Sequence, residues 1–181
     1  ARNRVICVRE DHTQDGEPIN AIVAVDALGK AEQVVLSQGS DFCSTPRISP
    51  DGSTLAWLTW DHPNMPWDGT LLLVASINDQ GLLGEPQVVV GGKTESIFQP
   101  EWSPDGRLYF VSDRTGWWNI YRRLDGRDEA VTEEEAEFGL PQWAFGMCTY
   151  GFASAQRIIC AYNRRGTWHI ADLDTESRNL R

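Results

Sequence analysis

The residues of this chain that could do chemistry are carboxylates, histidines and aromatic side chains in the polar segments between apolar runs. The candidates for a contact site fall in three such segments: Glu10, Asp11 and His12; Asp61, His62, Asn64, Met65, Trp67 and Asp68; Asp113 and Arg114. No serine has the flanking glycines of a Gly-x-Ser-x-Gly nucleophile elbow, and no His-Glu-x-x-His zinc motif is present. We therefore predict no catalytic residue, no metal and no cofactor, and interpret the three segments as candidates for contact with a substrate or another domain.

A four-residue motif, Ser-Pro-Asp-Gly, occurs at residues 49–52 and again at residues 103–106. Proline presets φ at the first central turn position, aspartate suits the second, and glycine adopts the left-handed conformation that follows. Each copy follows a short segment headed by Pro46 or Pro100 and leads into an apolar run, so each predicts a hairpin. A similar but weaker segment is headed by Pro141. The three prolines that head these segments are therefore 54 and 41 residues apart. A period of roughly 40–50 residues with four strands in each unit is typical of β-propeller blades.

The pattern predicts an all-β fold, a partial β-propeller of four-stranded antiparallel blades that forms a single segment over residues 1–181. Two blades are complete and two are partial, with boundaries near residues 4–37, 44–91, 97–133 and 139–181. The last blade is expected to start with a strand near residues 140–145, and only residues 133–137 look helical. Because a closed propeller has no exposed sheet edges, we expect the exposed blade edges of this segment to favour self-association.

The bulk composition narrows the range of partners. The net charge is −10, which disfavours a nucleic-acid backbone as a partner. No run of about 18 apolar residues exists, so we expect no membrane span. The four cysteines lack metal-ligand spacing, and three of them lie in apolar, strand-like settings typical of buried free thiols. They are Cys7, Cys43, Cys148 and Cys160. Free thiols are compatible with a reducing cytosol, so we expect a cytoplasmic location.

Alternate connections of a propeller lie on opposite edges, and one set of connections is markedly acidic. In addition to the candidates named above, this set contains Asp15, Glu17, Glu95, Glu133, Glu134, Glu135 and Glu137. It is either a solvated rim or a surface that attracts a cationic ligand, such as the free amine of a peptide. Residues 60–69 include two prolines, two tryptophans and a methionine, which is unusual for a solvent-facing loop. They pack either on their own blade or against another domain or a ligand.

A further indication comes from seven segments taken together. They are residues 4–12, 44–52, 55–57, 60–70, 98–119, 135–139 and 141–143. These segments resemble the propeller of serine peptidases of the prolyl oligopeptidase family, of the bacterial acylaminoacyl-peptidase or dipeptidyl-aminopeptidase type. The Ser-Pro-Asp-Gly turns are unspecific, because TolB-like propellers share them. Residues 60–70 and 113–119 are far more specific for the prolyl oligopeptidase family.

The resemblance implies a two-domain serine hydrolase, in which an N-terminal propeller caps a C-terminal α/β-hydrolase domain with a Ser, Asp and His triad. In that family the propeller restricts access to small peptides and supplies groups that bind the amino end of the substrate. The hydrolase domain is absent from these 181 residues, so no catalytic residue is carried over. The expected partners are that hydrolase domain, a peptide substrate and, through the blade edges, another copy of the chain. The expected location is the cytoplasm of a bacterium.

Two functions stay open. The leading hypothesis is the non-catalytic propeller portion of such a peptidase, which caps the active site and restricts or orients small peptide substrates. The alternative is a TolB-like propeller that acts as a protein-interaction module with no attached enzyme. A self-standing metal or glycosyl enzyme has little support, because scattered carboxylates on loops do not define a catalytic pair.

Overall fold

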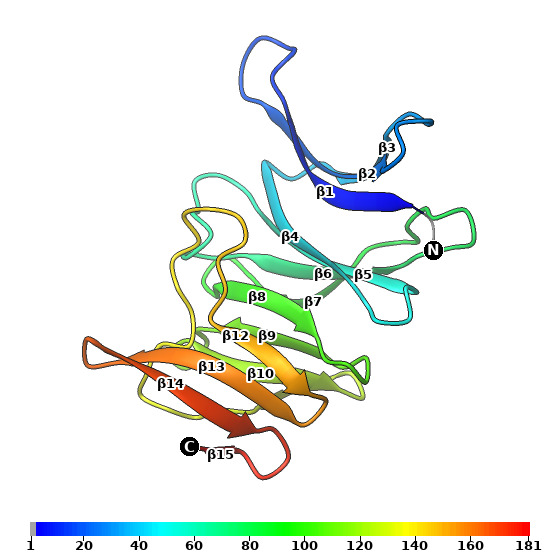
Figure 1. Ribbon diagram of the computed structural model, residues 1–181. Coiled ribbons are helices and arrows are strands. Elements are labelled where there is room, and N and C mark those ends of the chain that lie inside the picture. Colours follow the sequence, from blue (N-terminus) through cyan, green and yellow to red (C-terminus); the bar gives the residue numbers. More distant parts are fainter. Residues whose placement is uncertain (1–2) are drawn as a thin grey trace.

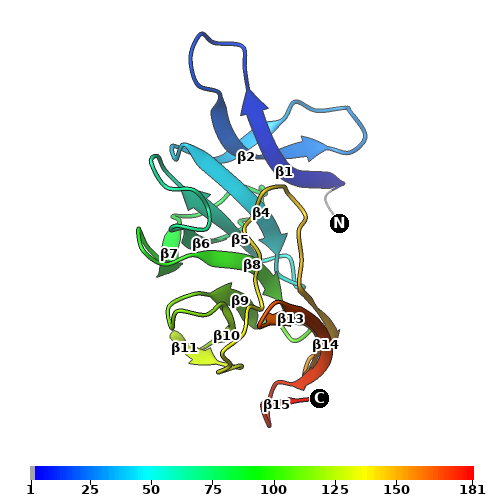
Figure 2. The same cartoon turned by 90° about the vertical axis from the view of Figure 1, so that its left-hand side faces the viewer.

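The computed structural model describes residues 3–181 as four antiparallel sheets, each built from strands that follow one another in sequence. The strands are β1 (Arg4–Asp11), β2 (Ile19–Asp26), β3 (Val34–Gln38), β4 (Phe42–Ile48), β5 (Thr54–Trp60), β6 (Leu71–Ser76), β7 (Gln87–Gly91), β8 (Ile97–Trp102), β9 (Leu108–Ser112), β10 (Asn119–Leu124), β11 (Arg127–Ala130), β12 (Tyr150–Ser154), β13 (Arg157–Arg164), β14 (Thr167–Asp174) and β15 (Asn179–Leu180). We call β1–β3 blade 1, β4–β7 blade 2, β8–β11 blade 3 and β12–β15 blade 4. Figures 1 and 2 show the blades stacked in this order as an open row. The predicted all-β fold of antiparallel propeller blades is confirmed.

The entry to blade 4 differs from the prediction. The sequence pattern placed its first strand near residues 140–145, but β12 begins at Tyr150. Gln99 of β8 explains the difference, because its side chain holds the start of β12 rather than the Pro141 region. Gln99 Nε2 donates to the Tyr150 carbonyl at 2.7 Å, and Gln99 Oε1 accepts from the Thr149 N–H at 2.7 Å. All three residues are buried.

The short helix predicted at residues 133–137 is also wrong. The Asn119 side chain donates to the Glu134 carbonyl and accepts from the Glu134 N–H, both at 3.0 Å. These bonds satisfy both backbone groups of Glu134 outside a helix, and residues 133–137 form bends and an isolated bridge from Glu137 to Asn163. Among residues 3–181 no helix is long and apolar enough to cross a membrane.

Both Ser-Pro-Asp-Gly turns form the predicted hairpins between the first and second strands of their blades. In the first turn Gly52 has φ 76° and donates its N–H to the Ser49 carbonyl at 2.8 Å. Ser49 Oγ donates to Asp51 at 2.6 Å, and the second turn repeats this pattern. Hydrogen bonds from Ser49, and then from Ser53, lower the pKa of Asp51 to about 2. The turn aspartate is therefore a structural anion.

Apolar side chains fill the three junctions between blades. Successive residues of a strand point to opposite faces, so β5 sends Leu55 and Trp57 towards blade 1 and Leu58 towards blade 3. All three side chains are completely buried. The junction of blades 3 and 4 has the largest cluster, which includes Tyr109, Ile120, Phe138, Ile158 and Leu173. Full burial of one such side chain stabilises the fold by about 1.5–3 kcal/mol, so these junctions are the main source of stability.

Blade 4 exposes to solvent the face that blade 3 buries. Val111 pairs with Ile120 in blade 3, and Ala161 pairs with Ile170 at the corresponding place in blade 4. Ile120 is completely buried, whereas Ile170 is 83% exposed. Other exposed apolar side chains of the two terminal blades are Val5, Val35, Ile159 and Trp168. Each end of the row therefore presents an uncovered apolar sheet face.

The four cysteines are free thiols. Cys43 and Cys160 are buried as predicted, and burial raises the pKa of their thiols to about 11 and about 12 respectively. Cys7 is half-buried and Cys148 is exposed. Thiol reactivity at neutral pH is therefore expected first at Cys148.

We expect the chain to self-associate through its uncovered end faces, because association would remove Ile170 and its neighbours from water. Sedimentation velocity over a wide range of concentrations should show oligomers that dissociate on dilution. Ile170→Asp should shift the chain to monomer, because it places a charge in the contact. Leu28→Asp is the control, since Leu28 is 58% exposed but lies in the turn between β2 and β3. A wild-type chain that stays monomeric at high concentration would contradict the expectation.

A second prediction concerns the turn aspartate and pH. The folded-state pKa of Asp51 is lowered from 3.8 to about 2. Its contribution to stability is therefore present above the unfolded-state pKa and is lost as the pH falls through about 2. Asp51→Asn should be less stable than wild type near neutral pH, and urea unfolding should show this gap closing in acid. Asp15→Asn is the control, since Asp15 makes no hydrogen bond or ion pair within the described chain. A gap that is independent of pH would count against the assignment.

Candidate interaction surface

Connections that leave one edge of the blades are hydrogen-bonded into a single surface, which we call the loop edge. It consists of residues 61–70, 92–96, 113–118 and 131–149. Thr70 donates its N–H to the Glu95 carbonyl at 3.0 Å, and Ser96 Oγ donates to the Pro66 carbonyl at 2.9 Å. Asp113 accepts from the Ser96 N–H at 2.8 Å. The 92–96 connection thus joins the loops of blades 2 and 3.

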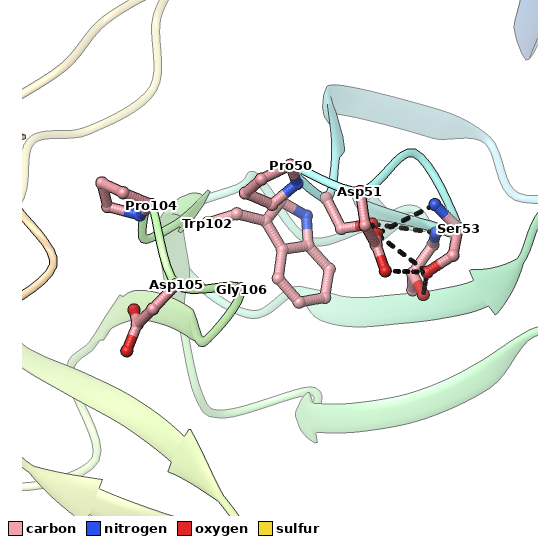
Figure 3. A pocket seen from close by; sticks show the side chains of 9 residues that line it. Pro50, Asp51, Ser53, Trp102, Pro104, Asp105 and Gly106 are labelled. Carbon is pink, nitrogen blue, oxygen red and sulfur yellow. Dashed lines mark hydrogen bonds between the residues drawn. The ribbon is translucent and has the colours of Figure 1, made fainter.

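The opposite edge of the blades carries the two Ser-Pro-Asp-Gly turns, and we call it the turn edge. A groove of about 260 Å³ lies between the two turns. Figure 3 shows the Trp102 indole between the two turns. Its Nε1 donates to the Arg47 carbonyl at 3.1 Å. The Asp51 carboxylate is occupied by Ser49 and Ser53, as the dashed lines in Figure 3 indicate for Ser53. With these groups already bonded, the groove offers little for recognising a ligand.

The predicted polar residues of the 61–70 loop hold the loop in place. Asp61 Oδ1 accepts from the Asp41 N–H at 2.7 Å, which ties the loop to the connection between blades 1 and 2. Asn64 Nδ2 donates to a backbone carbonyl of the 92–96 connection at 2.9 Å. Asp68 accepts from the Met65 N–H at 2.9 Å and closes a tight turn. These side chains are structural rather than free for a ligand.

The predicted residues of blade 1 lie apart from this surface. Glu10 Oε2 lies 3.5 Å from His12 Nε2, and Asp11 Oδ2 lies 3.8 Å from a terminal guanidinium nitrogen of Arg9. Hydrogen bonds from Thr13 are the main cause of the lowered pKa of Asp11. In the described chain no hydrogen bond or ion pair joins Glu10, Asp11 or His12 to the loop edge.

Asp113 and Arg114 belong to the loop edge and are already paired. Arg114 Nε donates to Glu95 at 2.9 Å, and a terminal guanidinium nitrogen donates to Asp128 at 3.3 Å. The guanidinium lies 4.7 Å from the Tyr121 ring centroid, which is a cation–π distance. Burial raises the pKa of Asp113, and the nearby charge of Glu95 adds to the effect. Arg114 therefore neutralises part of the expected acidic surface.

Most of the other carboxylates predicted for this surface also form hydrogen bonds or ion pairs within the chain. Glu137 accepts from the Trp118 N–H at 3.0 Å, and Glu134 pairs with Arg164 at 2.6 Å. Of the acidic residues predicted for this edge, those without a hydrogen bond or ion pair in the described chain are Asp15, Glu17, Glu133 and Glu135. Glu133 and Glu135 line a groove of about 400 Å³ together with Trp117. Within the described loop edge, this groove is the one place where carboxylates without a hydrogen bond or ion pair lie beside an exposed aromatic side chain.

An apolar projection accompanies these polar groups. Trp67 and Trp143 lie with ring centroids 4.3 Å apart, and Trp67 also packs on the core between blades 3 and 4. Trp143 is 73% exposed, and nearby in sequence Phe145 is 58% and Met65 45% exposed. We call Met65, Trp67, Trp143 and Phe145 the aromatic knob. In Figure 1 the loops of residues 61–70 and 131–149 lie to the left of β6 and β8.

The aromatic knob shows what the 61–70 loop packs against, which the sequence left open. It also includes Trp143 and Phe145, which the sequence analysis did not select. The 61–70 loop packs through Trp67 on the junction of blades 3 and 4, and through His62 on Phe42 of its own blade. Trp143 and Phe145 were missed because their segment was interpreted as a strand. The proline at Pro141 and the glycine at Gly146 bracket this segment and are the signal that could have indicated a loop.

The histidines do not form a site together. Among residues 3–181 no three His, Cys, Asp or Glu side chains are grouped so that they could hold a metal ion. His62 packs edge-on against Phe42 at 5.0 Å, and His169 stacks on Tyr162 at 5.1 Å. His12 is on blade 1, far from both in the chain.

Comparison with solved structures identifies relatives of this chain. A serine-to-alanine mutant of puromycin hydrolase in complex with PGG is 35% identical with a TM-score of 0.93, over 99% of this chain and 28% of that chain. A puromycin-hydrolyzing peptidase from Mycobacterium tuberculosis is 35% identical with a TM-score of 0.89, over 98% of this chain and 29% of that chain. TolB from Acinetobacter baumannii has a TM-score of 0.66 at 17% identity, over 98% of this chain and 40% of that chain, which shows a shared fold alone. No family model and no curated protein matches the chain.

The class of protein is therefore the propeller that TolB and the prolyl oligopeptidases have in common. More particularly, the chain matches the N-terminal propeller portion of puromycin hydrolase, a peptidase of the prolyl oligopeptidase family, as its sequence segments indicated. It spans 28% of the length of that puromycin hydrolase chain.

The two tryptophans of the aromatic knob should differ in their effect on folding. Trp67→Ala removes packing from the core of blades 3 and 4, so it should lower the free energy of unfolding by about 2 kcal/mol. Trp143→Ala removes a mostly exposed side chain and one ring contact, so its cost should be below about 1 kcal/mol. Urea unfolding followed by circular dichroism measures both. Equal costs would show that Trp143 is a core residue.

Proposed function

We propose that this chain is the non-catalytic propeller portion of a serine peptidase of the prolyl oligopeptidase type, and that it caps the active site and restricts or orients small peptide substrates. The observation that carries this proposal is the match to puromycin hydrolase, at 35% identity and a TM-score of 0.93 over 99% of the chain. A match this complete covers both the inner packing and the loop edge, so it goes beyond the shared propeller fold.

The physical properties of the loop edge support a role beside an active site. Its connections are joined to one another by hydrogen bonds of 2.8–3.0 Å, so they form one continuous surface. The net charge of −10 gives a field that attracts the positive amino end of a peptide. Glu133 and Glu135 are the carboxylates of this edge with no partner in the described chain, and they are therefore the best placed to meet such an amine.

A TolB-like interaction module without an attached enzyme is the alternative function. The TolB match, at 17% identity, supports the fold but not this function. The serine peptidase is therefore the better supported of the two. A cytoplasmic, bacterial location stays a prediction.

The test is to isolate the native protein from its source with an antibody to this chain and to treat it with a fluorophosphonate probe, which labels activated serines. We expect a labelled protein much larger than 20.3 kDa. The purified 181-residue chain is the control and should be neither labelled nor active, because it contains no nucleophile elbow. A native protein that is clearly recovered but unlabelled would refute the proposal and favour the interaction module.

A further inference from the structure

Large apolar side chains are exposed on the two loops of the loop edge that meet at the contact between Trp67 and Trp143. Trp143, Phe145 and Met65 are 73%, 58% and 45% exposed, and Trp143 rests on Trp67. Their number is notable because single exposed apolar residues are normal, whereas several in a cluster mark an interaction site. Trp143 lies mostly outside the blade core, so folding alone does not account for its position.

Hydrogen bonds anchor the two loops of the aromatic knob at several points of their main chain. Asp68 closes the turn at Met65, and Ser96 Oγ fixes the Pro66 carbonyl at 2.9 Å. On the other loop, Trp143 donates its N–H to the Pro141 carbonyl at 2.9 Å. Gln99 fixes the end of that loop at Thr149. Rigid aromatic anchors lose little conformational entropy on binding, which is a property of interface hot spots.

The chemistry of the aromatic knob distinguishes between three potential partners: a bound peptide, a folded domain and a second copy of the chain. A bound peptide needs hydrogen-bond partners for its backbone, but the nearby side chains of Asp61, Asn64 and Asp68 are already used to hold the loop. The exposed side chains of Met65, Trp143 and Phe145 offer a folded partner apolar and aromatic contact area, which is enriched at the centre of protein–protein interfaces. A second copy of the chain is better served by the uncovered end faces around Ile170, which lie on a different part of the molecule.

We propose that the aromatic knob docks onto the catalytic domain of the same polypeptide and so sets the loop edge of the propeller against that domain. The inference rests on the proposed function. In the matched puromycin hydrolase this segment is 28% of a longer chain, so most of that chain lies outside it and is available as the occupant. It follows that the groove of Glu133 and Glu135 faces the same domain, whereas the turn edge with the Ser-Pro-Asp-Gly motifs faces away.

The experiment compares the full-length protein with the 181-residue chain by amide hydrogen exchange. Residues 61–70 and 141–148 should exchange about tenfold or more slowly in the full-length protein, because docking protects the two loops. The turns at residues 49–52 and 103–106 should exchange equally in both. Equal exchange at the knob in the two proteins would overturn the docking, and this comparison needs no variant.

Variants test which side chains are responsible. W143A/F145A in the full-length protein should accelerate proteolytic cleavage between the domains by about fivefold or more, because the interface loses its anchors. Leu28→Ala is the matched control, since Leu28 is also exposed but lies on the turn edge, and it should leave cleavage unchanged. An unchanged cleavage rate in W143A/F145A would contradict the assignment of the anchors.

Fluorophosphonate labelling separates the two levels of the argument. A full-length protein that is labelled, but whose knob is not protected, refutes the docking and leaves the proposed function intact. An unlabelled full-length protein refutes the proposed function, and the docking onto a catalytic domain with it.

Discussion

The structure depends on apolar contact between the facing surfaces of neighbouring sheets. Because side chains alternate along a strand, β5 buries Leu55 and Trp57 against one neighbour and Leu58 against the other. A single blade would expose the side chains of both faces to water and could not be stable alone. Each blade therefore needs its neighbours, and the fold extends one blade at a time, as in other repeat architectures. The uncovered Ile170 face shows the same requirement unmet at the end of the row.

Blade packing separates the two edges of the molecule. The turn edge is made of short hairpins whose polar groups bond to each other, as Ser49 and Asp51 do. The loop edge combines two connections within a blade, residues 61–70 and 113–118, with two connections between blades, residues 92–96 and 131–149. Those connections have backbone groups to satisfy, and side chains such as Asp61 and Asn64 satisfy them. The carboxylates that looked like a binding surface are for this reason largely structural.

The remaining chemistry of the loop edge is simple. Two free carboxylates, Glu133 and Glu135, line a groove beside Trp117, and an aromatic knob stands at Trp143. The chain matches the propeller portion of puromycin hydrolase, and this segment is 28% of that longer chain.

The sequence by itself determined the blades and the family, because turn chemistry and strand alternation are local and the Ser-Pro-Asp-Gly turns punctuate them directly. It also pointed to the 61–70 loop, whose tryptophans and prolines are unusual in a solvent-facing loop. Only the tertiary structure decided where β12 begins and which carboxylates are free. Both depend on partners far away in sequence: Gln99 selects Thr149 and Tyr150 across 50 and 51 residues, and Arg164 pairs with Glu134 across 30. Local patterns carry no information about such contacts, since they form only when the blades pack side by side.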